Sequence, residues 1–356
     1  MPSVLVAFVL CEVLVRYFNL APGVHAIQVN APRSAYKLSK NPILIYELKE
    51  NYHDDNPDYF DRLPHTNSHG QRDHERSWLK PNGVRRIIVL GDSVTVGDGI
   101  ADLDDTIPRQ LEQSLQTDTE VLNLGIAGYC TYSEAELLKV KGLKYRPDLV
   151  IVIFVENDYQ HLAIGVQADD VDSRGRVDMP WSSRRPAAIE KLFASSDAFR
   201  YLSLRANLYG FRDQWEPHPL HRITGFEGFG VREGLKKMVD LSDKYGFNTM
   251  IAIWPSFETA IEDRHVCVDD SDRLVVERIA EEFRVPTFRL SDYFQKDYLT
   301  RTSGLKREYP SPRSVYTFDG MHPNETGAMI AADALTSILN SHPELLDVSV
   351  QKRPAE

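Results

Sequence analysis

The sequence predicts an α/β fold, a three-layer α/β/α sandwich with a central parallel sheet of about five strands. Short apolar runs rich in β-branched residues recur along the chain, and helical patterns lie between them. The runs are apolar on both sides, which is typical of parallel strands covered on both faces. Regular alternation of strand and helix favours right-handed βαβ units, and these assemble into a doubly wound sheet.

The predicted elements follow one another in a regular order. The strands are RRIIVLGDS (85–93), TEVLNLG (119–125), PDLVIVIFV (147–155), FNTMIAIWP (247–255) and VPTFRLS (285–291). Helical patterns cover 105–117, 133–144, 229–245 and 271–283, and a last helix is expected over 324–340. These elements together predict one globular domain over residues 85–345.

Composition excludes some classes of function. The 356 residues carry a formal net charge of −11 without a clustered basic face, which argues against a nucleic-acid partner. Cys11, Cys130 and Cys267 form no CxxC pair and no spacing with histidine that is typical of a metal site. The sequence therefore predicts a folded globular protein and makes no prediction of oligomeric state.

Residues 1–22 are expected to form a membrane anchor. The run SVLVAFVLCEVLVRYFNLA, which starts at Ser3, is apolar apart from Glu12, Arg16 and one asparagine. The free energy gained by inserting the apolar side chains into a membrane nearly cancels the cost of inserting the two charged ones. Glu12 and Arg16 lie four residues apart, so they can pair on one face of a helix and reduce that cost. The anchor would make the membrane a partner and place the catalytic domain outside the cytoplasm. A cleaved signal peptide and a helix packed on a soluble protein remain as alternatives.

Two segments break the strand-helix pattern. Residues 23–84 are rich in Pro, Asn, Asp and His and predict an irregular lead-in to the domain. Residues 159–225 separate the third and fourth predicted strands, with a helix expected near 187–207. A connection of this length is usually functional or mobile, so we expect this insertion to act as a lid or substrate wall.

The stretch VLGDSVTVGDG (89–99) predicts a nucleophile. A strand that ends in a small residue and a hydroxyl places that hydroxyl at the carboxyl edge of the sheet, where ligands of open α/β folds bind. We therefore interpret Ser93 as the attacking residue. A phosphate-binding loop is a poor alternative, because neither GxxxxGK[ST] nor GxGxxG occurs here.

The partners of such a serine are sought elsewhere in the chain. In FDGMHPNETG (318–327), Asp319 lies three residues before His322, and a carboxylate there can fix the tautomer of the imidazole. Taken alone, this pair is also consistent with an ordinary surface or core histidine. A metal half-site is a further alternative, but no second histidine cluster completes it.

Donors for an oxyanion are expected after the second and third strands. Gly125 and Gly128 lie in VLNLGIAGYCT (121–131), where glycine allows close backbone approach and an unobstructed N–H. FVENDYQ (154–160) ends the third predicted strand, and Asn157 within it offers a side-chain amide. An ordinary turn and a helix cap are the alternative interpretations of these two places.

These four stretches together resemble the SGNH, or GDSL, superfamily of serine esterases and acyltransferases. The resemblance is carried by GDSVTVG, NLGIAG, VEND and DGMH in that order, and it covers about residues 85–342. TNSHGQRD (66–73) is similar to the lead-in motif of membrane-anchored bacterial members, with Arg72 either a packing or a substrate-side residue. One departure is Val155, which stands where the family commonly has glycine and is expected to narrow the pocket.

The resemblance implies a flavodoxin-like sandwich with neither a metal nor an organic cofactor. It implies Ser93 as nucleophile, His322 as general base and acid, and Asp319 as the orienting carboxylate. The implied oxyanion hole consists of the Ser93 and Gly128 backbone N–H groups and the Asn157 side-chain amide.

The implied activity is hydrolysis of carboxylic esters through an acyl-enzyme on Ser93. As an esterase or deacetylase, the protein would act on a small ester or on O-acyl groups of envelope glycans or lipids. An O-acyltransferase that uses the same triad is the alternative, since the motif is common to both. A catalytically silent envelope binding protein is a third interpretation, and the intact set of catalytic residues argues against it.

Overall fold

Five parallel strands form the central sheet in the order β4-β3-β5-β6-β7. The computed structural model describes residues 2–18, 20–21, 35–41, 43–44, 46–54, 63, 65–115, 118–159, 186–210, 229–257, 271–303 and 310–347. The strands of the sheet are β3 (Arg85–Leu90), β4 (Thr119–Asn123), β5 (Leu149–Phe154), β6 (Asn248–Ile253) and β7 (Thr287–Arg289). Every strand predicted from the apolar runs is confirmed.

The strand order confirms the flavodoxin-like fold. Counted along the chain, the five strands are arranged 2-1-3-4-5, and all neighbours pair in parallel. The order reverses between β3 and β5, so helices leave these two strands toward opposite faces. Ligands of open α/β sheets bind at this switch point, outside the carboxyl ends of the strands.

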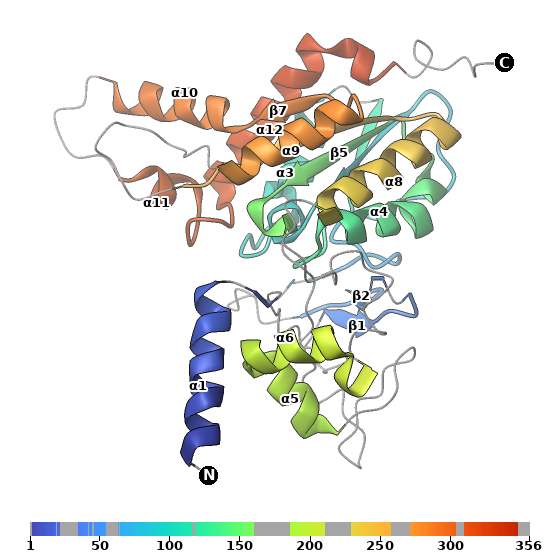
Figure 1. The fold of residues 1–356 in the computed structure, drawn as a ribbon. Helices are drawn as coiled ribbons and strands as arrows, with labels where there is room; N and C mark the ends of the chain where they lie inside the picture. Colours follow the sequence, from blue (N-terminus) through green and yellow to red (C-terminus); the bar gives the residue numbers. More distant parts are fainter. Residues whose placement is uncertain are drawn as a thin grey trace.

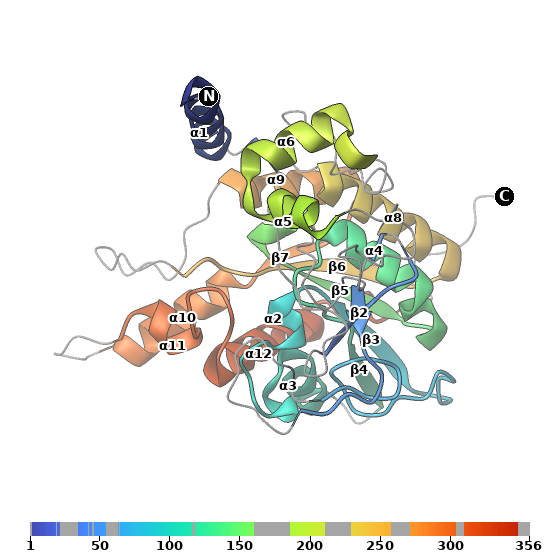
Figure 2. The same ribbon diagram turned by 90° about the horizontal axis from the view of Figure 1, so that it is seen from below.

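Helices cover both faces of the sheet and create two cores (Figure 2). The helices and short helical turns of this domain are α2 (Ser93–Val96), η1 (Leu103–Asp105), α3 (Ile107–Ser114), α4 (Thr131–Val140), η2 (Gly142–Tyr145), η3 (Glu156–Tyr159), α8 (Phe229–Tyr245), α9 (Ser271–Glu282), α10 (Ser291–Thr302), α11 (Pro312–Tyr316), α12 (Glu325–Ser341) and η7 (Pro343–Leu345). Successive β3 residues alternate between the cores: Ile88 packs with α4, α8 and α9, and Ile87 packs with α3, α10 and α12. The expected three layers are confirmed.

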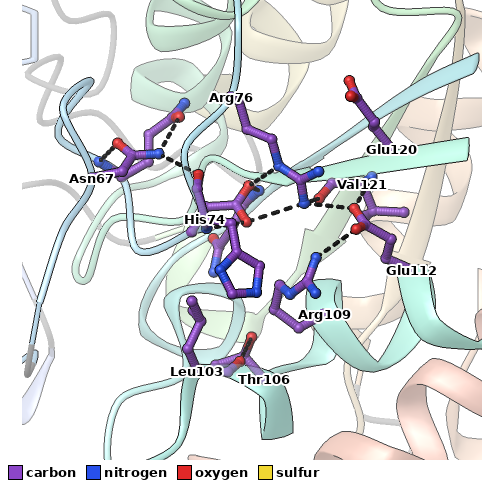
Figure 3. Close-up of polar contacts among 12 residues, drawn as sticks. Asn67, His74, Arg76, Leu103, Thr106, Arg109, Glu112, Glu120 and Val121 are labelled. Atoms are coloured by element: carbon purple, nitrogen blue, oxygen red, sulfur yellow. Dashed lines mark hydrogen bonds and ion pairs between the residues drawn. The ribbon is translucent and has the colours of Figure 1, made fainter. Parts of the chain in front are cut away.

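The described part of the lead-in segment packs on the domain. Its two short strands, β1 (Tyr36–Leu38) and β2 (Tyr46–Leu48), pair antiparallel, and Tyr46 is fully buried in the α4-side core. Figure 3 shows Arg76 reaching Glu112 of α3 at 2.6 Å, beside the backbone of Val121. The lead-in is therefore bound to the edge of the sheet by charge pairs as well as by apolar burial.

The N-terminal helix α1 (Pro2–Tyr17) lies against α6 (Asp197–Ala206) (Figure 1). The predicted pair of Glu12 and Arg16 forms at 2.8 Å. Glu12 also accepts hydrogen bonds from the Ser196 hydroxyl and from the backbone N–H groups of Asp197 and Ala198, at 2.7, 3.0 and 2.9 Å. Burial raises the pKa of Glu12, but these bonds outweigh it and lower the pKa to about 2. Glu12 thus caps the N-terminus of α6 from another helix.

In the part of the chain that the structure describes, no helix combines the length and the apolar character needed to cross a membrane.

Replacing Glu12 with alanine is expected to loosen the start of α6. Loss of a helix cap costs about 0.5–2 kcal/mol, which corresponds to about 2- to 30-fold faster amide exchange at Asp197 and Ala198. Hydrogen exchange measured by mass spectrometry checks this. Arg16→Ala is the matched control, because it removes the charge partner and leaves the cap, and equal exchange in the two variants would contradict the capping role.

The helix expected near 187–207 is divided in two. The helix α5 (Ala187–Ser195) ends where α6 begins, because the Ser196 hydroxyl accepts a bond from the Phe199 N–H and starts a new helix. The short turn η5 (Leu208–Gly210) follows. Residues 160–185 and 211–225 of the insertion lie outside the described residues, so the expected lid stays a prediction.

Candidate active site

Ser93 is the first residue of α2, directly after the carboxyl end of β3. Asp92 caps this short helix by accepting the Val94 N–H at 2.9 Å. A Cβ at Gly91 would collide with the Thr95 side chain, so only glycine fits between the strand and the helix. The tight turn therefore places the Ser93 hydroxyl at the switch point of the sheet.

The structure brings the three predicted triad residues together. His322 Nε2 lies 2.9 Å from Ser93 Oγ, and His322 Nδ1 lies 2.7 Å from Asp319 Oδ2. Both ring nitrogens are therefore within hydrogen-bond reach, one of the hydroxyl and the other of the carboxylate. This is the geometry that general-base activation of a serine requires.

The loop between α11 and α12 holds the histidine in place. Asp319 Oδ1 accepts the backbone N–H groups of Met321 and His322, both at 2.9 Å. The indole of Trp254, at the end of β6, donates to the Met321 carbonyl at 2.9 Å. The aspartate thus both shapes the loop and orients the imidazole.

Asp319 remains ionised over the pH range in which such an enzyme works. Burial raises the pKa of this carboxyl, but the hydrogen bonds from His322 and Met321 outweigh it and hold the pKa below its usual 3.8. The lowered pKa contributes stability above the unfolded value, and this contribution is lost as the pH falls through the folded value. Acid inactivation through Asp319 is therefore expected only below about pH 4.

Replacing Asp319 with asparagine is expected to lower kcat by about 10² to 10⁴ with little change in KM. The amide oxygen can still accept the two backbone N–H groups, so the loop is kept, but the imidazole loses its carboxylate. Steady-state kinetics with an ester substrate check this. Glu344→Gln is a matched control, because Glu344 also pairs with a histidine, His342 at 3.0 Å, but at the other end of α12 from the triad. Unchanged kcat in Asp319→Asn would contradict the orienting role.

The glycine loop after β4 lies against the nucleophile turn. The Ile126 N–H donates to the Gly91 carbonyl at 3.1 Å, and a Cβ at Gly125 would collide with the backbone of Thr95 and Val96. Gly128 has φ +76, which favours glycine. Within the described residues, the backbone N–H groups of Ser93 and Gly128 donate to no protein acceptor. Both are therefore available to a ligand.

Asn157 lies in η3, directly after β5 on the other side of the switch point. Its Nδ2 donates to Asp92 Oδ2 at 2.7 Å. An amide nitrogen carries two hydrogens, so one remains for a substrate oxygen. Asn157 therefore lies next to the nucleophile turn, and its hydrogen bond to Asp92 holds it there.

Asp92 is the site residue that sequence reasoning missed. Its carboxylate accepts hydrogen bonds from the Val94 N–H at the start of α2 and from the Asn157 side-chain amide. Asp92 therefore links the turn that carries the nucleophile to an oxyanion donor. Its position between Gly91 and Ser93 is the only signal for this role in the sequence.

Arg72 is a packing residue rather than a substrate-side one. It is almost fully buried, and its guanidinium donates to backbone carbonyls at the end of α2 and just after it, which include those of Val96, Gly97 and Ile100. Val155 is also buried and packs in the core on the α12 side. Among the described residues, no group of three or more His, Cys, Asp or Glu side chains could hold a metal ion.

A comparison with families of known proteins identifies one match. Residues 89–330, well over half of the chain, match the sequence model of the GDSL-like lipase/acylhydrolase family. A search of curated proteins gives no match.

Several solved structures share a distant likeness. The chain is similar to the acetyl xylan esterase AlAXEase, at 17% identity over 71% of this chain and 99% of that one, with a TM-score of 0.41. It is similar to a catalytic mutant of an acetylxylan esterase from Geobacillus stearothermophilus, at 16% identity over 73% and 95%, with a TM-score of 0.42. It is also similar to a carbohydrate acetylesterase family member from Sinorhizobium meliloti, at 15% identity over 74% and 99%, with a TM-score of 0.39.

Proposed function

Because this chain belongs to the GDSL-like lipase/acylhydrolase family and is an ester-hydrolysing enzyme, we propose that it cleaves carboxylic esters through an acyl-enzyme on Ser93. The observation that carries this proposal is the continuous contact from Ser93 Oγ through the His322 ring to the Asp319 carboxylate. A serine hydroxyl is a weak nucleophile at its ordinary pKa, and an adjacent base is what activates it.

The proposed cycle has two acyl transfers. His322 Nε2 takes the proton of Ser93 as Oγ attacks the ester carbonyl, and the resulting imidazolium is stabilised by Asp319. The same proton is then given to the leaving alcohol, and an ester of Ser93 remains. Water attacks this ester with His322 again as base, which releases the carboxylic acid and restores the hydroxyl.

The oxyanion of both steps is assigned to the N–H groups of Ser93 and Gly128 and to the Asn157 amide. The first two have no protein acceptor among the described residues, and Asn157 is held beside the turn by Asp92. Fixed donors of this kind stabilise the negative charge that develops in the transition state.

Replacing Asn157 with alanine is expected to lower kcat by about 10² to 10³, because one oxyanion donor is lost. KM should change little, since the donor acts mainly on the transition state. Steady-state kinetics check this, and labelling of Ser93 by a fluorophosphonate should slow in parallel. A variant that keeps wild-type kcat would remove Asn157 from the oxyanion hole.

The substrate class we propose is a small O-acyl ester, and the experiment uses the full chain with p-nitrophenyl acetate and butyrate. Turnover in water with release of free acid supports an esterase, and the acetate-to-butyrate ratio reports the acyl chain that the site accepts. Acetylated glycan and lipid ester substrates then compare the two proposed alcohols.

The same assay distinguishes the acyltransferase alternative. With a sugar added as acceptor, an acyltransferase would give acylated sugar in preference to free acid. Absence of turnover together with absence of Ser93 labelling would support a silent binding protein and contradict the proposal.

A further inference from the structure

Three carboxyl side chains from three segments are buried beneath the nucleophile turn. Asp92 comes from the β3–α2 turn, Glu134 from α4, and Asp158 from η3 after β5. Their exposed fractions are 0%, 0% and 1%. Asp158 lies within electrostatic range of both Glu134 and Asp92, and Glu134 lies within range of Asp92. The proposed mechanism assigns no role to Glu134 or Asp158.

The three carboxyls differ in their hydrogen bonds. Asp92 accepts two N–H donors, from Val94 and Asn157. In contrast, both carboxyl oxygens of Glu134 and Oδ1 of Asp158 are buried without a partner among the described residues, and Asn157 Oδ1 is in the same condition. Four buried acceptors therefore lack a donor at one place, and such a set is costly unless protons are present.

Among the described residues, no cation lowers the pKa of Glu134 or Asp158. The charged neighbours of Asp158 are Glu134, Asp92 and Cys130, and Tyr46 lies near both Asp92 and Cys130. All of these become negative when they ionise.

A lysine of α8 reaches α4 but pairs with a different carboxylate. Lys237 bonds to Glu136, two residues beyond Glu134. Burial, and then the neighbouring acids, raise the pKa of both Glu134 and Asp158 well above the usual carboxyl range.

We propose that Glu134 and Asp158 are positioning residues that stay as neutral carboxylic acids at working pH, so that Asp92 is the single carboxylate of the cluster and holds the Asn157 amide beside Ser93. This inference rests on the proposed function. Each neutral acid supplies an O–H donor to a group of four buried acceptors that otherwise lack one. A second carboxylate beside Asp92 would repel it and disturb its bonds to Val94 and Asn157.

The proposal has a direct consequence for pH dependence. The folded pKa of these acids is raised, so their stabilising contribution is complete below the unfolded pKa and is lost as the pH rises through the folded pKa. Because the two groups are coupled, they titrate as a pair. We therefore expect kcat to decline at alkaline pH, because ionisation of the pair disturbs the hydrogen bond by which Asp92 holds the Asn157 amide.

Neutral isosteres test the proposal. Glu134→Gln, Asp158→Asn and the double variant are expected to keep kcat within about threefold of wild type at neutral pH, and the double variant should lose the alkaline decline in kcat. Glu134→Ala should lower kcat by about tenfold or more, because it leaves polar groups unpaired. Glu136→Gln, on the same helix, is the matched control and should leave the alkaline limb unchanged. A loss of kcat in Glu134→Gln as large as in Asn157→Ala would overturn the proposal.

An infrared measurement keeps the test independent of activity. The wild-type minus Glu134→Gln difference spectrum at neutral pH should contain the C=O stretch of a protonated carboxyl, shifted in D₂O. If only carboxylate bands appear, the inference is wrong even when Ser93 is labelled and esters are hydrolysed. If the protonated band appears but no ester is cleaved, the proposed function fails and the neutral acid remains.

Discussion

Replacing Ser93 with alanine is expected to lower kcat for p-nitrophenyl acetate by about 10⁴-fold or more, to near the background rate. The hydroxyl is the nucleophile of the first acyl transfer, and His322 Nε2 lies 2.9 Å from it. KM can be measured only if some turnover remains. Substrate binding to the variant is therefore measured separately, by competition with a substrate analogue. Steady-state kinetics with freshly folded protein measure the effect.

Ser133→Ala is the control for this variant. Ser133 is a buried serine at the start of α4, the helix that follows the glycine loop, so its loss tests general packing. Retained activity in Ser133→Ala with loss in Ser93→Ala is the expected result. Comparable activity in wild type and Ser93→Ala would move the chemistry to another residue.

Replacing His322 with alanine is expected to lower kcat by about 10⁴-fold as well, because an unactivated serine attacks esters poorly. The two losses should not add in the double variant, since the two residues act as one unit. Fluorophosphonate labelling of Ser93 should slow strongly in His322→Ala, which separates loss of activation from loss of the nucleophile.

His342→Ala is the matched control for the histidine. His342 also has Nδ1 against a carboxylate, Glu344 at 3.0 Å, but it lies at the far end of α12. This variant should retain full activity. Rapid labelling of Ser93 in His322→Ala would show that another group is the base.

The fold could be predicted because the strands are buried on both faces. Runs such as LVIVIF of β5 admit few other structures, and the helices between them keep an apolar period. The helix α10 was not predicted, since Ser291–Thr302 is mostly polar and follows β7 without a turn signal. The pairing of β1 with β2 was also missed, because three-residue strands carry too little periodicity to stand out.

The site was predictable in part for a different reason. Ser93, Asp319 and His322 each belong to a local motif, so short stretches of sequence identify them. The link from Asn157 to Asp92 joins residues 65 apart, and it depends on which strands are neighbours in the sheet. Glu134 gave no signal, because a glutamate in the polar first turn of a helix is usually solvated, whereas this one is fully buried.

The central claim is that Ser93 carries the acyl group, and one measurement tests it most directly. The full chain is reacted with a fluorophosphonate, digested and sequenced by mass spectrometry, beside wild type quenched during turnover of p-nitrophenyl butyrate. The account predicts a phosphonyl adduct and a butyryl ester, both on Ser93 and both absent from Ser93→Ala. Ester turnover with the acyl group on another residue, or with no covalent intermediate trapped and Ser93 unmodified, would contradict it.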